Sequence, residues 1–175
     1  MEIGNTNTRF CDLHTHSTCS DGTLTPEELV GLALERGLGA IALTDHNTVA
    51  GCTRFAAAAA GKPIHAVCGA EFSTDFAGEE LHLLGLFLPS LIFDEVTAFM
   101  AKRNAMKEDS NRQTIENLRA AGFDISYEEL CAAFPGIFRN RSHIAQLLIR
   151  KGIVQSVNEA FRKLLDTDCG FYIRP

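Results

Sequence analysis

Four short apolar segments in the first half of the chain restrict the possible fold more than any other feature of the sequence. They cover residues 10–14, 40–44, 64–70 and 81–88. Each segment is mostly apolar on both faces, which is typical of strands buried in a parallel sheet and unlike strands with one face in water. We therefore expect four buried strands at these positions.

Helical segments separate the first three of these strands. The motif TPEE at residues 25–28 supplies an N-cap, a proline in the first turn and two acids near the positive end of the helix dipole. A second helix is predicted over residues 49–60, because its alanine run favours helix. This alternation of strand and helix is expected of a parallel sheet or barrel. Only residues 73–80 separate the third and fourth strands, so this pair is predicted to form a hairpin-like return.

From residue 93 onward the pattern is helical. Residues 93–121 have helical periodicity around a central polar stretch, NAMKEDSNRQ. Ser126 and Glu129 have the spacing of a capping box, and two further helices are predicted over residues 140–151 and 156–165. We therefore predict two domains, residues 10–92 and 93–175, which follow a polar leader at residues 1–9 and are not separated by a flexible linker.

Charge and composition exclude several classes of function. The net charge of -6 gives no reason to expect general nucleic-acid or membrane binding, which normally needs a basic face. A negative protein still binds phosphate when metal ions supply positive charge locally. No secretory signal and no apolar run near the ~20 residues of a membrane span is visible, so a cytoplasmic protein is expected. The six cysteines have neither C-x-x-C nor zinc-finger spacing, and disulfides are not expected.

Ionisable side chains gather at the ends of the predicted strands. His14 and His16 lie two residues apart, so both project from the same side of the first strand. His46 follows the second strand and Glu71 ends the third, at the carboxyl ends where barrels and open sheets collect catalytic groups. His82 lies within the fourth. Imidazole and carboxylate hold borderline divalent metals, and more than four such ligands indicate more than one ion.

Each of these residues also has an ordinary interpretation. An H-x-H pair fits a surface role equally well, and Asp21 lies in the sequence Ser20-Asp21-Gly22, which is also a plain turn signal. A lone histidine between two leucines, as at His82, is more often a satisfied core residue. The whole set is far less expected by chance than any member. We interpret it as half or more of a multinuclear metal site built for hydrolysis.

The segment DLHTHSTCSDGTLTPEELVGLALERGLGAIALTDHNTVAG resembles the opening of the PHP (polymerase and histidinol phosphatase) family of metal-dependent phosphoesterases. The resemblance spans residues 10–88 and implies an α/β fold, namely a partial TIM-like PHP barrel of about four strands followed by a helical subdomain. It implies two or three divalent ions (Zn²⁺, Mn²⁺, Fe²⁺ or Mg²⁺) and a small phosphorylated substrate, with a nucleotide as one candidate. The metal ligands that it implies are His14, His16, Asp21, His46, Glu71 and His82.

The helical segment, with RNRSHIAQLLIRKG and FRKLL, resembles the insert of a PHP subgroup that includes nucleotide phosphatases and 5′-to-3′ exoribonucleases. This resemblance makes Arg141 and His143 candidates for binding substrate phosphate, because guanidinium forks match phosphate oxygens. The alternative for both residues is a helix start with ordinary surface charges.

The sequence also departs from the family pattern. A complete member has a later histidine in an A-H-P-like motif and a closing D-x-H pair, and neither occurs here. The family's barrel does not close with four strands, which leaves an open edge and uncovered apolar surface. A fragment, a decayed enzyme and a shortened product remain alternatives, and we expect a shortened product whose open edge is covered by a homo-oligomer or another partner. The alternative to a phosphoesterase is a catalytically weak metal-binding or interaction module.

Overall fold

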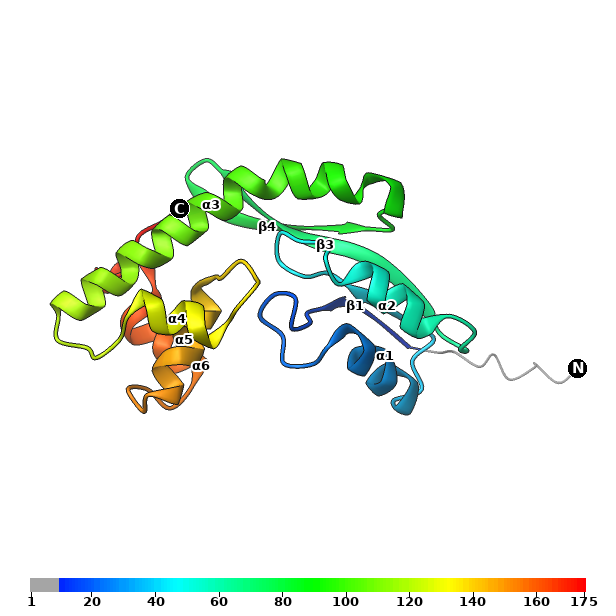
Figure 1. Ribbon diagram of the computed structural model, residues 1–175, viewed down its shortest axis with the longest axis horizontal. Helices are drawn as coiled ribbons and strands as arrows, with labels where there is room; N and C mark the ends of the chain where they lie inside the picture. The colour runs from blue at the N-terminus through cyan, green and yellow to red at the C-terminus, as the bar shows by residue number, and fades with distance from the viewer. Residues whose placement is uncertain (1–9) are drawn as a thin grey trace, which may run out of the picture. The chain divides into compact units, whose positions relative to one another are not determined.

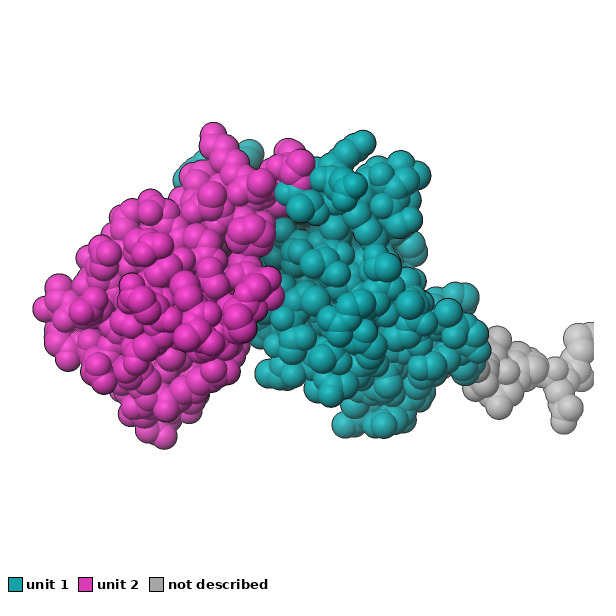
Figure 2. Space-filling view, in the orientation of Figure 1, with its two compact units in different colours: residues 1–97 teal, residues 98–175 magenta. Residues whose placement is uncertain are grey.

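The structure is a computed structural model that describes residues 10–175 (Figure 1). The polar leader predicted for residues 1–9 lies outside the described residues. The chain divides into two compact units, residues 1–97 and 98–175 (Figure 2). The predicted boundary between residues 92 and 93 falls at the start of helix α3 (Phe93–Ala120), which crosses this division, and that boundary stays a prediction.

A curled four-stranded sheet with the order β1-β2-β3-β4 forms the centre of the first unit (Figure 1). β2 pairs in parallel with β1 and β3, and β4 is antiparallel to β3. The bounds are β1 (Cys11–Thr15), α1 (Pro26–Glu35), β2 (Ala40–Leu43), α2 (Cys52–Ala59), β3 (His65–Phe76) and β4 (Glu79–Leu86). The predicted alternation of strand and helix and the hairpin-like return are therefore confirmed. The expectation of four buried strands is wrong for β1 and β4, which are largely exposed because they lie at the two edges of the sheet.

The third strand is longer than the sequence predicts. We expected it to end at residue 70 and residues 73–80 to form a connection, but β3 continues to Phe76. The hydrogen-bonded register with β4 covers eight residue pairs and extends the strand through polar residues. Ala77 (φ 54°) and Gly78 (φ 83°) form the turn, and two left-handed residues are what a two-residue hairpin requires.

Helix α1 shows how the sequence covers this sheet. Thr25 and Glu28 form a capping box, in which the Glu28 backbone N–H donates to Thr25 Oγ1 (3.2 Å) and the Thr25 N–H donates to Glu28 Oε2 (2.8 Å). Removing such a cap costs about 1 kcal/mol. Beyond the cap, α1 packs in a core formed by Leu29, Val30, Ala33, Ile41, Leu43, Phe55, Ala59 and Ile64. This core holds the strands whose ends carry the ionisable residues.

The second unit is helical and has its own core. After α3 it contains α4 (Tyr127–Ala133), α5 (Arg141–Arg150) and α6 (Val157–Ala160). Among the described residues, no helix has both the length and the apolar character that a membrane crossing needs. The helix predicted over residues 156–165 is confirmed, although its second half, Phe161–Leu165, is a π-helix and not an α-helix. There the Asp166 N–H bonds to Phe161 O (2.9 Å), which places Leu164 and Leu165 in the core.

Part of the polar stretch in the middle of α3 is buried, together with the threonine that follows it. Ser110, Asn111 and Thr114 are at most 4% exposed. Asn111 Nδ2 donates to Arg139 O (2.8 Å), and the Ile173 backbone N–H donates to Thr114 Oγ1 (3.1 Å). These side chains therefore satisfy backbone groups of segments that lack regular structure, as buried polar groups must.

Candidate metal centre

The six residues predicted as metal ligands lie together in the first unit, in its four strands or in the segments that follow them. His14 lies in β1, His16 follows it, and Asp21 lies in the next turn; His46 follows β2, Glu71 lies in β3, and His82 in β4. A parallel bridge between His46 and Glu71 joins the segment after β2 to β3. The strand order therefore brings together residues that are up to 68 positions apart, from His14 to His82.

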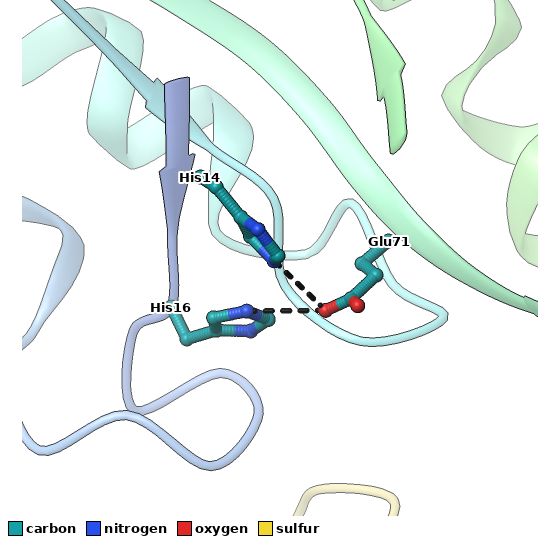
Figure 3. A group of neighbouring side chains, drawn as sticks. All are labelled: His14, His16 and Glu71. Carbon is teal, nitrogen blue, oxygen red and sulfur yellow. Dashed lines mark hydrogen bonds and ion pairs between the residues drawn. The ribbon is translucent and has the colours of Figure 1, made fainter. Parts of the chain in front are cut away.

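A register shift in β1 helps to direct its two histidines. Asp12 pairs with Ile41 and Thr15 with Leu43, so three steps along β1 match two along β2. Such irregularities re-aim side chains and are frequent beside functional sites. The ring centroids of His14 and His16 are 5.1 Å apart, and Figure 3 shows both rings directed at the carboxylate of Glu71.

Glu71 lies among four imidazoles. Its Oε2 atom is 3.2 Å from His14 Nε2, 3.1 Å from His16 Nε2 and 3.2 Å from His46 Nδ1. Its Oε1 atom is 2.8 Å from His82 Nδ1. Only 5% of Glu71 is exposed, so this carboxylate is screened from water. Three nitrogens around one buried oxygen are the arrangement of donors that share a cation.

Asp21 extends the site on the other side of His16 and His46. Its oxygens are 3.6 Å from His16 Nδ1 and 3.6 Å from His46 Nε2. Three overlapping groups result, and in each the ligand atoms lie within 4.8 Å of one another. The groups are His14–His16–Glu71, His16–Asp21–His46 and His46–Glu71–His82. His16, His46 and Glu71 each belong to two groups, which is the pattern of a centre for more than one ion.

The environment sets the charge of the central residues. Burial lowers the pKa of His46 to about 4, although Asp21 and Glu71 oppose this shift. Burial acts to raise the pKa of Glu71, but the interaction with His46 and the hydrogen bonds from His14 and His82 outweigh it, so that this pKa is lowered. At neutral pH the site therefore presents an ionised carboxylate and a neutral imidazole with a lone pair available for a ligand.

The Nδ1 atom of His46 tests whether the site fits a cation. It is a buried atom without a hydrogen-bond partner, although Glu71 Oε2 lies 3.2 Å away. A neutral imidazole carries one proton, so His46 cannot donate to both Asp21 and Glu71. A lone pair that faces a carboxylate is unfavourable unless a cation lies between them. Two donors that are each ~2.1 Å from one ion lie about 3 Å apart, as these do, so the residues fit divalent cations.

Sequence reasoning missed the buried polar residues that support these ligands. Asp45 is 1% exposed and Asn47 3%, and they flank His46 on both sides. Their partners include Ser17 and Ser73, which lie on the segments that carry the other ligands. The one available signal was the polar sequence TDHN at the end of an apolar strand.

Arg141 and His143, the predicted phosphate-binding residues, lie at the start of α5 in the second unit. His143 is 1% exposed, and its Nδ1 accepts a hydrogen bond from the Asn140 backbone N–H (2.9 Å) in a capping box. The Arg141 guanidinium lies over the Tyr172 ring, 4.2 Å from its centroid. His143 thus belongs to a helix start, but it is buried and not on the surface. A phosphate-binding role for both residues stays a prediction.

Comparison with a family model and with curated proteins finds relatives that match most of this chain. A family model described as "PHP domain" matches residues 12–173. The chain is 34% identical over 158 residues to a 5'-3' exoribonuclease of Haemophilus influenzae, covering 90% of this chain and 57% of that protein. It is 32% identical over 162 residues to a 3',5'-nucleoside bisphosphate phosphatase of Chromobacterium violaceum, covering 88% of this chain and 54% of that protein. The chain thus spans about half the length of the curated relatives it matches.

A solved structure supports the fold. An amidohydrolase from Chromobacterium violaceum, solved with bound sulfate and no metal, has a TM-score of 0.86 at 30% identity. The alignment covers 94% of this chain and 58% of that chain. The fold predicted from the sequence, a partial barrel followed by a helical region, is therefore confirmed.

Proposed function

This chain belongs to the PHP domain family, and from that premise we propose that it is a metal-dependent phosphoesterase acting on phosphomonoesters of nucleotides. The observation that carries the proposal is the convergence of four histidines and two carboxylates in three overlapping groups, two of which contain His46, whose Nδ1 is a buried nitrogen without a hydrogen-bond partner. The chain has a net charge of -6, so phosphate binding needs a local source of positive charge.

The roles of the side chains follow from their contacts. Glu71 would serve up to two ions through its two carboxylate oxygens, whereas His16 and His46, which also belong to two groups each, would each offer one ring nitrogen to one ion, because a neutral imidazole has one free lone pair. His14, Asp21 and His82 would complete one group each. When bound, divalent ions neutralise phosphate oxygens and lower the pKa of a water from about 15.7 to around 7. Asp21, with a side chain 12% exposed, would help to position such a water through its carboxylate.

The substrate class rests on the relatives. One is named a 3',5'-nucleoside bisphosphate phosphatase and another a 5'-3' exoribonuclease, and both names describe cleavage of phosphate esters of nucleotides. Arg141 is the candidate in this chain for a phosphate contact away from the ions, because its guanidinium offers a planar fork of donors. We therefore propose a nucleoside bisphosphate as the first substrate to test.

The experiment is phosphate release from p-nitrophenyl phosphate and a nucleoside 3',5'-bisphosphate by the purified chain with added Mn²⁺. His46→Ala removes a ligand that belongs to two groups. His65→Ala is the matched control, since His65 is exposed at the first position of β3 and is not a candidate ligand. We expect release with wild type and His65→Ala and none with His46→Ala. Release that is unaffected by His46→Ala removes this centre from the reaction.

The second candidate is a metal-binding or interaction module with weak catalysis, and the surface of β4 favours it. β4 is an edge strand, and Leu81, Leu83 and Leu84 are 44%, 57% and 42% exposed. An exposed apolar edge is a site for association with a second copy or another partner. Bound Mn²⁺ without turnover, together with a dimer in light scattering that Leu83→Lys converts to monomer, supports this candidate. A monomeric wild type with turnover contradicts it.

A further inference from the structure

We propose that Asp45 and Asn47 are positioning residues, one on each side of His46, that hold the ligand-bearing segments in place. Asp45 holds the segment of His16 and Asp21, and Asn47 holds the strand of Glu71. The proposal rests on the proposed function, because it assigns roles around that metal centre. Neither residue is among the predicted ligands.

Asp45 fixes the turn that precedes Asp21. Its Oδ1 accepts hydrogen bonds from the Ser17 backbone N–H (2.7 Å) and from Ser20 Oγ (2.6 Å). Its Oδ2 accepts from Ser17 Oγ (2.7 Å). Asp45, Ser17 and Ser20 are at most 4% exposed, so these bonds do not compete with water. Three buried hydrogen bonds to one carboxyl group anchor this turn.

The anchored turn transmits this restraint to two ligands. Ser20 Oγ is 3.5 Å from His16 Nδ1 and 3.5 Å from Asp21 Oδ1. The turn is also tight, because a Cβ on Gly22 would lie 2.2 Å from His16 O. This close backbone approach leaves the turn little room to change its shape. Displacing it at Asp45 therefore displaces the ligand atoms of His16 and Asp21 together.

Asn47 fixes the other side of the site. Its Oδ1 accepts from the Ser73 backbone N–H (2.8 Å), and its Nδ2 donates to Ser73 Oγ (3.2 Å). Its own backbone N–H donates to Glu71 O (2.9 Å). Asn47 has a φ of 53°, a left-handed conformation that asparagine tolerates better than most residues. Ser73 Oγ in turn is 3.5 Å from His82 Nε2, so this clamp reaches both Glu71 and His82.

Each clamp reaches one outer group of ligands, and both reach the shared group His14–His16–Glu71. Asp21 belongs only to the group with His16 and His46, and His82 belongs only to the group with His46 and Glu71. Losing a residue that orients ligands typically costs 10–100-fold in metal affinity. We expect Asp45→Ala to weaken the first group by about that factor and Asn47→Ala to weaken the second. A general loss of stability would weaken all groups alike.

Double-mutant cycles separate these outcomes, because residues that act through one another are not additive. The measurement is Mn²⁺ titration of the full chain without substrate, followed by the electron paramagnetic resonance signal of free Mn²⁺. Because Asp45 also holds the segment of His16, we expect Asp45→Ala to add only part of its effect to Asp21→Ala but its full effect to His82→Ala. The reverse is expected for Asn47→Ala. Thr48→Ala is the control, since Thr48 Oγ1 accepts only a local bond from the Ala50 N–H (3.1 Å) among the bonds described for it.

Milder variants keep the test decisive if the alanine variants do not fold. Ser20→Ala removes one of the three bonds to Asp45. Asp45→Asn keeps one acceptor oxygen for the Ser17 backbone N–H and Ser20 Oγ and loses the acceptor for Ser17 Oγ. We expect Ser20→Ala to weaken the Asp21 group by a smaller factor and Asp45→Asn to restore most of the affinity that Asp45→Ala loses. Wild type that binds no Mn²⁺ overturns the proposed function itself. Wild type that binds Mn²⁺ while Asp45 and Ser20 variants match Thr48→Ala overturns only this inference.

Discussion

His46 and His143 are both largely buried histidines, yet they lie in opposite chemical environments. His46 lies between two carboxylates, and its Nδ1 has no hydrogen-bond partner. His143 accepts a hydrogen bond from the Asn140 N–H, and its ring lies edge-on to Phe134 with centroids 4.6 Å apart. A buried histidine is therefore not in itself a sign of a metal site. The distinguishing sign is a polar atom that the protein leaves unsatisfied beside an acid.

The carboxylates of the two units show the same contrast. Glu108 in the second unit pairs with Arg139 (2.9 Å) and also accepts from the Arg139 backbone N–H (2.9 Å). A permanent cation thus compensates its charge within the fold. Glu71 in the first unit is surrounded by imidazoles, and the most buried of these, His46, is neutral at pH 7. A buried acid without a fixed cation nearby is what an external cation would complete.

The largest expected effect on phosphate release comes from replacing Glu71 with its amide, and the same replacement at Glu108 is the control. Glu71→Gln keeps the shape but removes the charge shared by two ligand groups. We expect it to lower phosphate release at least about a hundredfold, since residues that merely orient ligands already cost 10–100-fold. Glu108→Gln, the matched control, should keep both the metal content and the rate. Elemental analysis and turnover measure both, and loss of metal in Glu108→Gln contradicts the contrast between the units.

Replacing the two histidines with alanine should affect stability more at His143 than at His46, although only His46 is a candidate metal ligand. His143→Ala removes the capping acceptor of α5 and a buried ring, and we expect the free energy of unfolding to fall by about 2 kcal/mol. In metal-free protein, His46→Ala removes a nitrogen that lacks a hydrogen bond at Nδ1, so a smaller loss is expected. Urea unfolding in EDTA measures both variants. A larger loss for His46→Ala would mean that His46 stabilises the fold without a cation.

Local patterns explain why most of the site was predictable. His46 and Glu71 lie at the carboxyl ends of apolar segments, and that position is visible in the sequence. The clamps were not predictable, because Asp45 bonds to Ser17 and Asn47 to Ser73, which are 28 and 26 residues away. No local periodicity connects such pairs. The extension of β3 and the π-helix were missed for the same reason, since cross-strand pairing and core packing override local preference there.

Cys52 and Cys68, two thiols of the first unit that are not candidate ligands, also influence each other's ionisation. The neighbouring Cys52 lowers the pKa of Cys68 to about 7. The thiolate is the reactive form, so iodoacetamide should modify Cys68 at a rate that rises with pH through about 7. Cys52→Ala removes the neighbouring thiol, and we expect modification of Cys68 at pH 7 to slow by about tenfold. Peptide mapping by mass spectrometry follows Cys68, and an unchanged pH profile in Cys52→Ala contradicts this assignment.

The smallest expected effect concerns the start of α5 in the second unit. Arg141 and Arg150 both lie over aromatic rings, 4.2 Å from the Tyr172 centroid and 4.7 Å from the Phe134 centroid. Lysine keeps the charge in either place but lacks the planar fork that matches phosphate oxygens. If Arg141 binds substrate phosphate, Arg141→Lys should raise KM for a nucleoside bisphosphate several-fold while kcat and Mn²⁺ affinity stay unchanged. Arg150→Lys is the control, because it loses a comparable ring contact. An equal rise in KM in Arg150→Lys would show that the effect comes from packing and would contradict a phosphate-binding role for Arg141.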